Sequence, residues 1–157
     1  MLHDSIVSPT HIIIIYHGGG YIYTQEIWKD IENYEGLYQI SNLGNVRSLD
    51  RDITYVTGRV QRLHGMLLKH TKQADGYYTV GLYDINHKVK TKTIHRLVAI
   101  HFLANPCDYP EVNHIDGNKA NDAVTNLEWV TELQNIRHAY TTGLKHGSDS
   151  PQCKPVQ

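Results

Sequence analysis

The sequence is poor in cysteine, and this shortage excludes several classes of small protein. Only two cysteines, Cys107 and Cys153, occur among 157 residues. They lack the close spacing of a zinc site, and a fold held together by disulfides needs more of them. We therefore expect reduced thiols in a cytoplasmic protein.

A long apolar run is also missing. The most apolar stretch, His11-Ile12-Ile13-Ile14-Ile15-Tyr16, is much shorter than the roughly 20 residues that cross a bilayer. No basic segment and small-residue cleavage site of the signal-peptide type accompany it. We expect no membrane partner, and we expect residues 1–24 to form a poorly ordered or edge-strand extension.

A strong net charge is the third absence, since the formal charge is only −1. The distribution of charge is uneven, however, because residues 45–100 hold ten lysines and arginines against four acidic residues, a local balance of +6. The basic residues are Arg47, Arg51, Arg59, Arg62, Lys69, Lys72, Lys88, Lys90, Lys92 and Arg96. Such a stretch between acidic ends is typical of a phosphate-contacting surface, although charge alone equally fits a solvated strand face.

The pattern from Trp28 to Phe102 predicts short strands followed by a helix. Residues 37–40 and 46–49 flank an Asn- and Gly-rich turn, which indicates a hairpin. Residues 51–64 look less regular. Lys88 to Ile94 alternates basic with small or apolar residues, which predicts a strand with its lysines on one face.

The C-terminal pattern predicts strand, loop, strand and helix. The strands are expected at 112–115 and 128–130, separated by a polar loop over 116–126. Thr131 is a good N-cap for the helix, and Gly143 suits the position just after its end.

Three segments of this module resemble a known motif. Asn113-His114-Ile115-Asp116-Gly117-Asn118-Lys119, then Asn126-Leu127-Glu128-Trp129-Val130-Thr131, then Asn135 resemble the HNH nuclease motif of phage and intron-encoded homing endonucleases. Residues 26–31 and 34–49 are similar to the NUMOD-type motif that precedes HNH modules, and 95–102 matches the helix leading into them. The resemblance covers roughly residues 26 to 146, so residues 1–24 are an addition to the family pattern, either genuine or from an over-long start-site assignment.

The resemblance implies an α+β fold in two parts. A strand-rich DNA-binding region would span residues 25–94, and a ββα-metal (His-Me finger) HNH nuclease module would span residues 95–146. Residues 147–157 would form a flexible tail. Larger relatives continue into further DNA-binding repeats.

The chemistry of phosphodiester hydrolysis points to His114 as general base. Its imidazole can accept a proton from water near neutral pH, and its second ring nitrogen can be oriented by a backbone carbonyl. By resemblance, Asn113 and Asn135 are metal ligands and Asn126 is the central Asn that fixes the loop. Oxygen ligands favour Mg²⁺ or Mn²⁺ over zinc. His138 is a second-shell or phosphate contact, or an alternative ligand, and the sequence does not separate these roles.

One departure from the family pattern concerns the charge at the metal. Many relatives carry Asp at the position of Asn113, and others carry His at the position of Asn135. With two neutral ligands the phosphate must supply the negative charge, so metal affinity without DNA should be weak. Asp116 lies nearby, but its Asp-Gly-Asn context indicates a turn.

The sequence thus predicts a metal-dependent HNH homing endonuclease acting on double-stranded DNA. We expect a monomer that nicks one strand, leaving 5′-phosphate and 3′-hydroxyl ends, in the cytoplasm of a bacterial or phage-infected cell. All the basic residues named above except Lys72 are candidate DNA contacts. Two alternatives remain: a DNA-binding protein with a degenerate, non-cleaving module, and a restriction or packaging HNH nuclease, which the motif at 34–49 disfavours.

Overall fold

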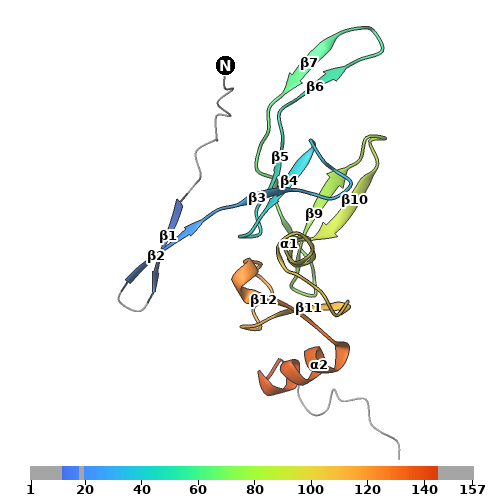
Figure 1. The fold of residues 1–157 in the computed structure, drawn as a ribbon. Coiled ribbons are helices and arrows are strands. Elements are labelled where there is room, and N and C mark those ends of the chain that lie inside the picture. Colours follow the sequence, from blue (N-terminus) through green and yellow to red (C-terminus); the bar gives the residue numbers. More distant parts are fainter. Residues whose placement is uncertain (1–11, 18–19, 145–157) are drawn as a thin grey trace, which may run out of the picture.

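The computed structural model describes residues 12–17 and 20–144, which form a mixed fold of short antiparallel sheets and two α-helices (Figure 1). The strands before the first helix are β1 Ile12–His17, β2 Gly20–Gln25, β3 Trp28–Asp30, β4 Tyr38–Ser41, β5 Val46–Ser48, β6 Arg51–Thr54, β7 Val60–Leu63, β8 Thr71–Lys72, β9 Tyr78–Tyr83 and β10 Val89–Thr93. The remaining elements are α1 Ile94–Phe102, β11 Glu111–His114, the 3₁₀ turn η1 Val124–Asn126, β12 Leu127–Val130 and α2 Glu132–Thr141. None of the helices within these ranges is long and apolar enough to span a membrane.

The N-terminal extension contains a hairpin. Strands β1 and β2 pair antiparallel, with Ile12 opposite Gln25. The rest of the predicted extension, residues 1–11 and 18–19, and the predicted tail, 147–157, lie outside the described residues.

The sheet β3-β4-β5 forms as the turn signals predict. The hairpin between β4 and β5 closes through Gly44, whose φ of 88° suits a residue without a Cβ. The chain then returns along this sheet, because the backbone N–H of Leu68 donates to the carbonyl of Val46 at 2.8 Å.

The expectation of an irregular stretch at 51–64 is wrong. Strands β6 and β7 form a regular antiparallel hairpin that projects from the body, with Thr54 opposite Val60 (Figure 1). The turn uses Gly58, at φ 79°. One face of the hairpin is half-buried and the other is exposed. The half-buried face mixes Arg51 and Gln61 with apolar residues, so the apolar-polar alternation by which strands are found is missing.

Helix α1 forms the centre of the core. Its Ile94 and Val98 are fully buried and pack with Ile40 of β4 and Leu82 of β9. Figure 1 shows α1 between the strand-rich region and the C-terminal elements. His101 also joins α1 to the segment after β3, because its Nε2 accepts a hydrogen bond from the backbone N–H of Glu32 at 3.0 Å.

The C-terminal elements follow the predicted order. Strands β11 and β12 pair antiparallel with Asn113 opposite Glu128 and His114 opposite Leu127. Helix α2 begins after Thr131, whose side chain forms a capping box with Gln134, and Gly143 follows its end at φ 73°.

Candidate active site

A pocket of about 300 Å³ lies between β11 and α2. Four of the residues singled out from the sequence line it: Asn113, His114, Asn135 and His138. The other lining residues are Tyr77, Val112, Gly117, Lys119, Ile136, Ala139 and Leu144. The fold therefore brings the predicted base and both predicted metal ligands to one cavity.

The sequence suggested that a backbone carbonyl orients His114. In the structure a carboxylate does so. The Nε2 of His114 lies 3.0 Å from Oδ1 of Asp122, in the loop between β11 and η1. Both side chains are buried, with 4% and 7% exposed. Asp122 reaches His114 because the polar loop over 116–126 folds back over the end of β11.

Two aromatic rings pack around His114. The His95 ring, from α1, lies 5.2 Å from it in an edge-on arrangement, and the Tyr77 ring lies 5.9 Å away. Burial, together with the neighbouring His114, lowers the pKa of His95 to about 4. His95 is thus neutral near pH 7 and adds no charge beside the proposed base.

His95, His114 and Asp122 offer three ligand atoms within 4.8 Å of one another. Two imidazoles and a carboxylate suit a transition metal such as zinc more than Mg²⁺. This buried cluster is a second place, besides the pair Asn113 and Asn135, where the described residues gather metal-binding groups.

Asn113 contacts a carboxylate that the sequence analysis did not single out. Its Nδ2 donates to Oε1 of Glu128 at 2.9 Å, across the β11–β12 pair. The bond occupies the amide nitrogen and leaves the amide oxygen available. Glu128 therefore places a negative charge beside a predicted metal ligand that is itself neutral.

Asn126 lies at the centre of the loop's hydrogen-bond network. Its Oδ1 accepts from the backbone N–H of Asp116 at 3.0 Å, and its Nδ2 donates to the Asp116 carboxylate and to the carbonyl of Asn121. Asn121 also donates to Asp116, and this bond is the main reason that the pKa of the Asp116 carboxyl is lowered. Asp116 is thus engaged in the turn.

Helix α2 supplies the far wall of the pocket. Asn135 is half-buried in its first turn. His138, one turn later, places Nε2 3.1 Å from the carbonyl oxygen of Ile115. Since a carbonyl only accepts, that nitrogen carries the proton, and the bond fastens α2 to the end of β11.

The candidate DNA-contacting residues fall into two groups. Six are exposed: Arg59, Arg62, Lys69, Lys88, Lys90 and Lys92. Of these, Arg62 forms ion pairs with Asp50 and Asp52. The half-buried ones, Arg47, Arg51 and Arg96, each lie over an aromatic ring.

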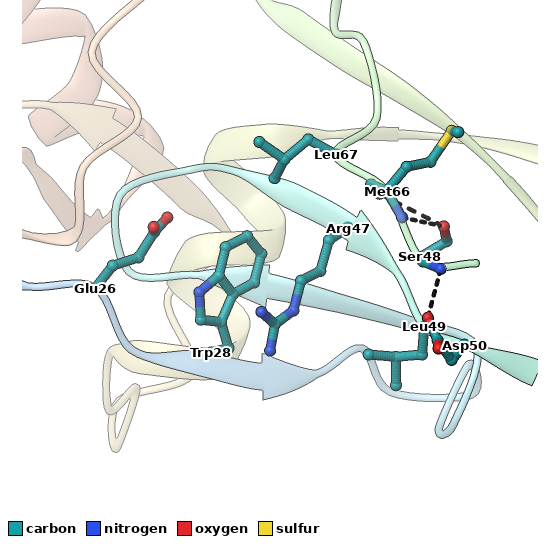
Figure 2. Close-up of a pocket in the computed structure, with 9 residues that line it drawn as sticks. Glu26, Trp28, Arg47, Ser48, Leu49, Asp50, Met66 and Leu67 are labelled. Atoms are coloured by element: carbon teal, nitrogen blue, oxygen red, sulfur yellow. Dashed lines mark hydrogen bonds between the residues drawn. The ribbon is translucent and has the colours of Figure 1, made fainter. Parts of the chain in front are cut away.

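Arg47 packs against other side chains of the strand-rich region. It lines an open cavity of about 490 Å³ on the strand-rich region, shown in Figure 2. Its guanidinium lies 4.2 Å from the centre of the Trp28 ring and donates twice to Oε1 of Gln39. Arg96 is similarly engaged, since it donates to the carbonyl of Pro110. Both have internal partners that the sequence did not reveal.

The residues that the sequence analysis missed share a cause. Asp122 and Glu128 lie 8 and 15 positions from their partners His114 and Asn113, so no local spacing marks them. Glu128 could have been found from strand register, because Asn113 lies opposite it once the two strands are paired.

Known proteins match both parts of the chain. A family model described as the NUMOD4 motif matches residues 26–83. The DNA endonuclease I-HmuI of Bacillus phage SP01 is 39% identical over 130 residues, 83% of this chain and 67% of its own length. An uncharacterized HNH endonuclease, L245, of Acanthamoeba polyphaga mimivirus is 41% identical over 118 residues, 75% of this chain but 31% of its own.

The likeness extends to three dimensions. A solved structure, described as DNA binding and cleavage by the HNH homing endonuclease I-HmuI, matches this chain with a TM-score of 0.61 and 41% identity. The match covers 78% of this chain and 62% of that one. The fold thus has a counterpart in one class of protein, the HNH endonucleases. The chain belongs to the family of HNH homing endonucleases.

Proposed function

We propose that the protein is a metal-dependent DNA endonuclease that hydrolyses a phosphodiester bond in the pocket between β11 and α2. The observation that carries this proposal is the meeting of His114, Asn113 and Asn135 at one cavity, although they come from a strand and a helix about 20 positions apart. The relatives' names, which describe DNA endonucleases, support the same activity.

The residues present fit a divalent ion that prefers oxygen. Asn113 and Asn135 would hold it through their amide oxygens, and the hydrogen bond of Asn113 to Glu128 leaves that oxygen available. Mg²⁺ or Mn²⁺ bound there would polarise the scissile phosphate and stabilise the departing 3′ oxygen. Glu128 supports the fit, because its charge partly offsets the neutrality of the two ligands.

His114 acts as general base in this proposal. Its Nε2 is engaged by Asp122, so its Nδ1 is the nitrogen that takes the proton from the attacking water. Asn126 holds the loop and His138 holds α2, which keeps the two walls of the pocket in register. Lys119, whose ammonium lies 4.3 Å from the centre of the Tyr77 ring, adds a positive charge at the rim.

The exposed lysines and arginines of residues 47–96 would hold double-stranded DNA by its phosphates, and the strands and turns of residues 37–94 would contact a groove. With this pocket as the hydrolytic site of a monomer, one strand is cut in each binding event. Products with 5′-phosphate and 3′-hydroxyl ends follow from attack by water with departure of the 3′ oxygen.

Nicking of supercoiled plasmid and phage DNA at low salt, with Mg²⁺ or Mn²⁺, tests the proposal. Wild type, His114→Ala and an EDTA control are compared, and His64→Ala, in which an exposed histidine is removed, is the matched control. We expect metal-dependent open circles with wild type and His64→Ala, and a loss of at least about 100-fold in His114→Ala.

Two results would contradict the proposal. DNA that is bound but stays intact in every lane would favour a degenerate, non-cleaving module. Cleavage that persists in His114→Ala would show that another residue is the base.

A further inference from the structure

The carboxylate of Asp122 determines which ring nitrogen of His114 carries the proton. An ionised carboxylate only accepts hydrogen bonds, so the 3.0 Å contact with Asp122 places the proton on Nε2 of His114. In the neutral imidazole the lone pair is then on Nδ1. A general base needs that lone pair on the side that faces water.

The surroundings of Nδ1 agree with this assignment. His114 lines the pocket together with Asn113 and Asn135. Among the described residues, Nδ1 of His114 has no hydrogen-bond partner, and it does not belong to the polar atoms that are fully buried without one. Nδ1 is thus the nitrogen of His114 that is left to face the pocket, where a water molecule can approach.

The other neighbours of the ring do not select the tautomer. Tyr77 and His95 contact it through their ring faces and edges, at centroid distances of 5.9 and 5.2 Å. These contacts hold the imidazole ring in place without favouring a proton on either nitrogen. Among the described residues, only Asp122 forms a hydrogen bond with the ring.

Asp122 is itself held from two sides. On one side is the turn between β4 and β5, because a Cβ at Gly44 would lie 2.9 Å from the Asp122 Cβ and the Val124 N–H donates to the Asn42 carbonyl at 2.8 Å. On the other side, Asn126 fixes the carbonyl of Asn121, the preceding residue. The carboxylate thus has a fixed position relative to the ring.

We propose that Asp122 is a positioning residue that holds His114 in the Nε2–H tautomer and directs Nδ1 at the attacking water. This inference rests on the proposed function, since it specifies how the base of that reaction is prepared. Asp122 is not among the residues that line the pocket between β11 and α2. It acts through His114.

The proposal distinguishes two substitutions of Asp122. Asp122→Ala removes the acceptor and lets the ring rotate and exchange tautomers. Asp122→Asn keeps the shape but offers an amide that can donate to Nε2, which favours the tautomer with its proton on Nδ1. We expect single-turnover cleavage to fall by about 100-fold or more in both variants, as when the carboxylate of other His–Asp pairs is replaced.

The experiment combines cleavage, DNA affinity and histidine NMR on the full chain. Long-range ¹H–¹⁵N correlation spectra of ¹⁵N-histidine protein report the tautomer, with the His114 signals assigned by their loss in His114→Ala. We expect Nε2–H in the EDTA-treated wild type, a mixed or reversed tautomer in the variants, and unchanged affinity for DNA. Asp108→Asn, the same change at an exposed carboxylate, should alter none of these readouts.

The outcomes separate this inference from the proposed function. Wild-type cleavage that is lost in His114→Ala but retained in Asp122→Ala and Asp122→Asn would overturn the inference alone. A wild-type spectrum with the proton on Nδ1 would also overturn it, even where the variants do not fold. Absence of cleavage by the wild type would overturn the proposed function and this inference with it.

Discussion

In the strand-rich region, residues 26–93, all lysines and two of the four arginines are exposed, and even Val56, Val60 and Tyr55 of the β6–β7 hairpin are exposed. In the module that follows, residues 94–144, several polar side chains of the candidate site are inside. Asn113, His114, Asp122 and Asn126 are each no more than 8% exposed, and each bonds to another polar side chain. A surface of exposed charged side chains can adapt to a long charged ligand, whereas a buried, hydrogen-bonded set of polar side chains fixes a few atoms for a reaction.

The two regions are nevertheless not independent. Gly44, in the turn between β4 and β5, lies against Asp122, and Tyr77, just before β9, packs against His95 and His114. Lys119 also reaches back to donate to the carbonyl of Asp75 at 2.8 Å. The NUMOD4 segment therefore provides part of the wall of the proposed active site, besides its basic surface.

Of the effects that distinguish the two regions, the largest expected one concerns the Asn113–Glu128 pair in the module. Asn113→Asp adds a first charged ligand, so we expect Mn²⁺ affinity without DNA to rise on the order of tenfold or more. In EDTA the same change sets two carboxylates side by side, which should lower the melting temperature. Calorimetric titration with Mn²⁺ and thermal melts measure the two effects.

The double variant Asn113→Asp, Glu128→Gln separates the effect of the added ligand charge on metal affinity from the effect of carboxylate repulsion on stability. It should keep most of the gain in metal affinity without the loss of stability in EDTA, because the glutamine amide can donate to the introduced carboxylate. Glu128→Gln alone is the control. Unchanged Mn²⁺ affinity in both aspartate variants would show that Asn113 does not face the metal.

The next effect belongs to the strand-rich surface. Replacing Lys88, Lys90 and Lys92 by alanine should weaken DNA binding and reduce the slope of log affinity against log salt by roughly 0.9 for each phosphate that is no longer neutralised. The single-turnover rate at saturating DNA should not change, because these side chains lie outside the pocket. The matching lysine-to-arginine variant keeps the charge and should keep the slope. An unaltered slope in the alanine variant would mean that β10 faces away from DNA.

The sequence predicted those features that depend on neighbouring residues. The turn at 41–45, the N-cap Thr131 and the end of α2 at Gly143 all follow from local rules of chain conformation, and the structure has them. The β6–β7 hairpin escaped because its half-buried face mixes polar with apolar residues, which gives no alternation of apolar and polar side chains.

The site was predictable only as far as its motif extends. The motif led to His114, Asn113, Asn126 and Asn135, and the pocket between β11 and α2 contains three of these four residues. Asp122 and His95 reach His114 through tertiary packing of a loop and of α1, so no sequence spacing marks them. Internal partners of Arg47 and Arg96 were hidden for the same reason, since a charge count treats every arginine as free.

A smaller effect tests the packing between the two regions. Gly44→Ala would place a Cβ 2.9 Å from that of Asp122, at a φ of 88°, so both the backbone and the Asp122 position must adjust. We expect a loss of roughly 1–3 kcal/mol of stability from the backbone strain, together with a lower cleavage rate. Gly58→Ala is a matched control, because Gly58 has φ 79° but no atom within 4 Å of the position that a methyl group would take. Equal cleavage rates in the two variants would show that the turn does not hold Asp122.

The smallest effect is a pH dependence of stability that arises from the module's interior. His95 has its pKa lowered from 6.5 to about 4, mainly by burial, and burial also lowers the pKa of His70. Between these values the unfolded chain binds protons that the folded chain does not, so stability falls as pH decreases from about 7 towards 4. The groups facing His95 are Tyr77, Asp75, Arg96, His114 and Asp122.

Chemical denaturation between about pH 7 and about pH 5.5 measures this slope, above the range where most carboxylates titrate. His95→Asn should make the slope shallower without abolishing it, because His70 still contributes. The exposed His64, replaced in the same way, should leave the slope unchanged. If His95→Asn keeps the full slope, folding does not lower the pKa of His95 from 6.5, and part of the folded protein then carries a positive charge beside His114 near that pH. That result would replace a neutral neighbour of the proposed base with a partly charged one, whose positive charge would act on the ring against the carboxylate of Asp122.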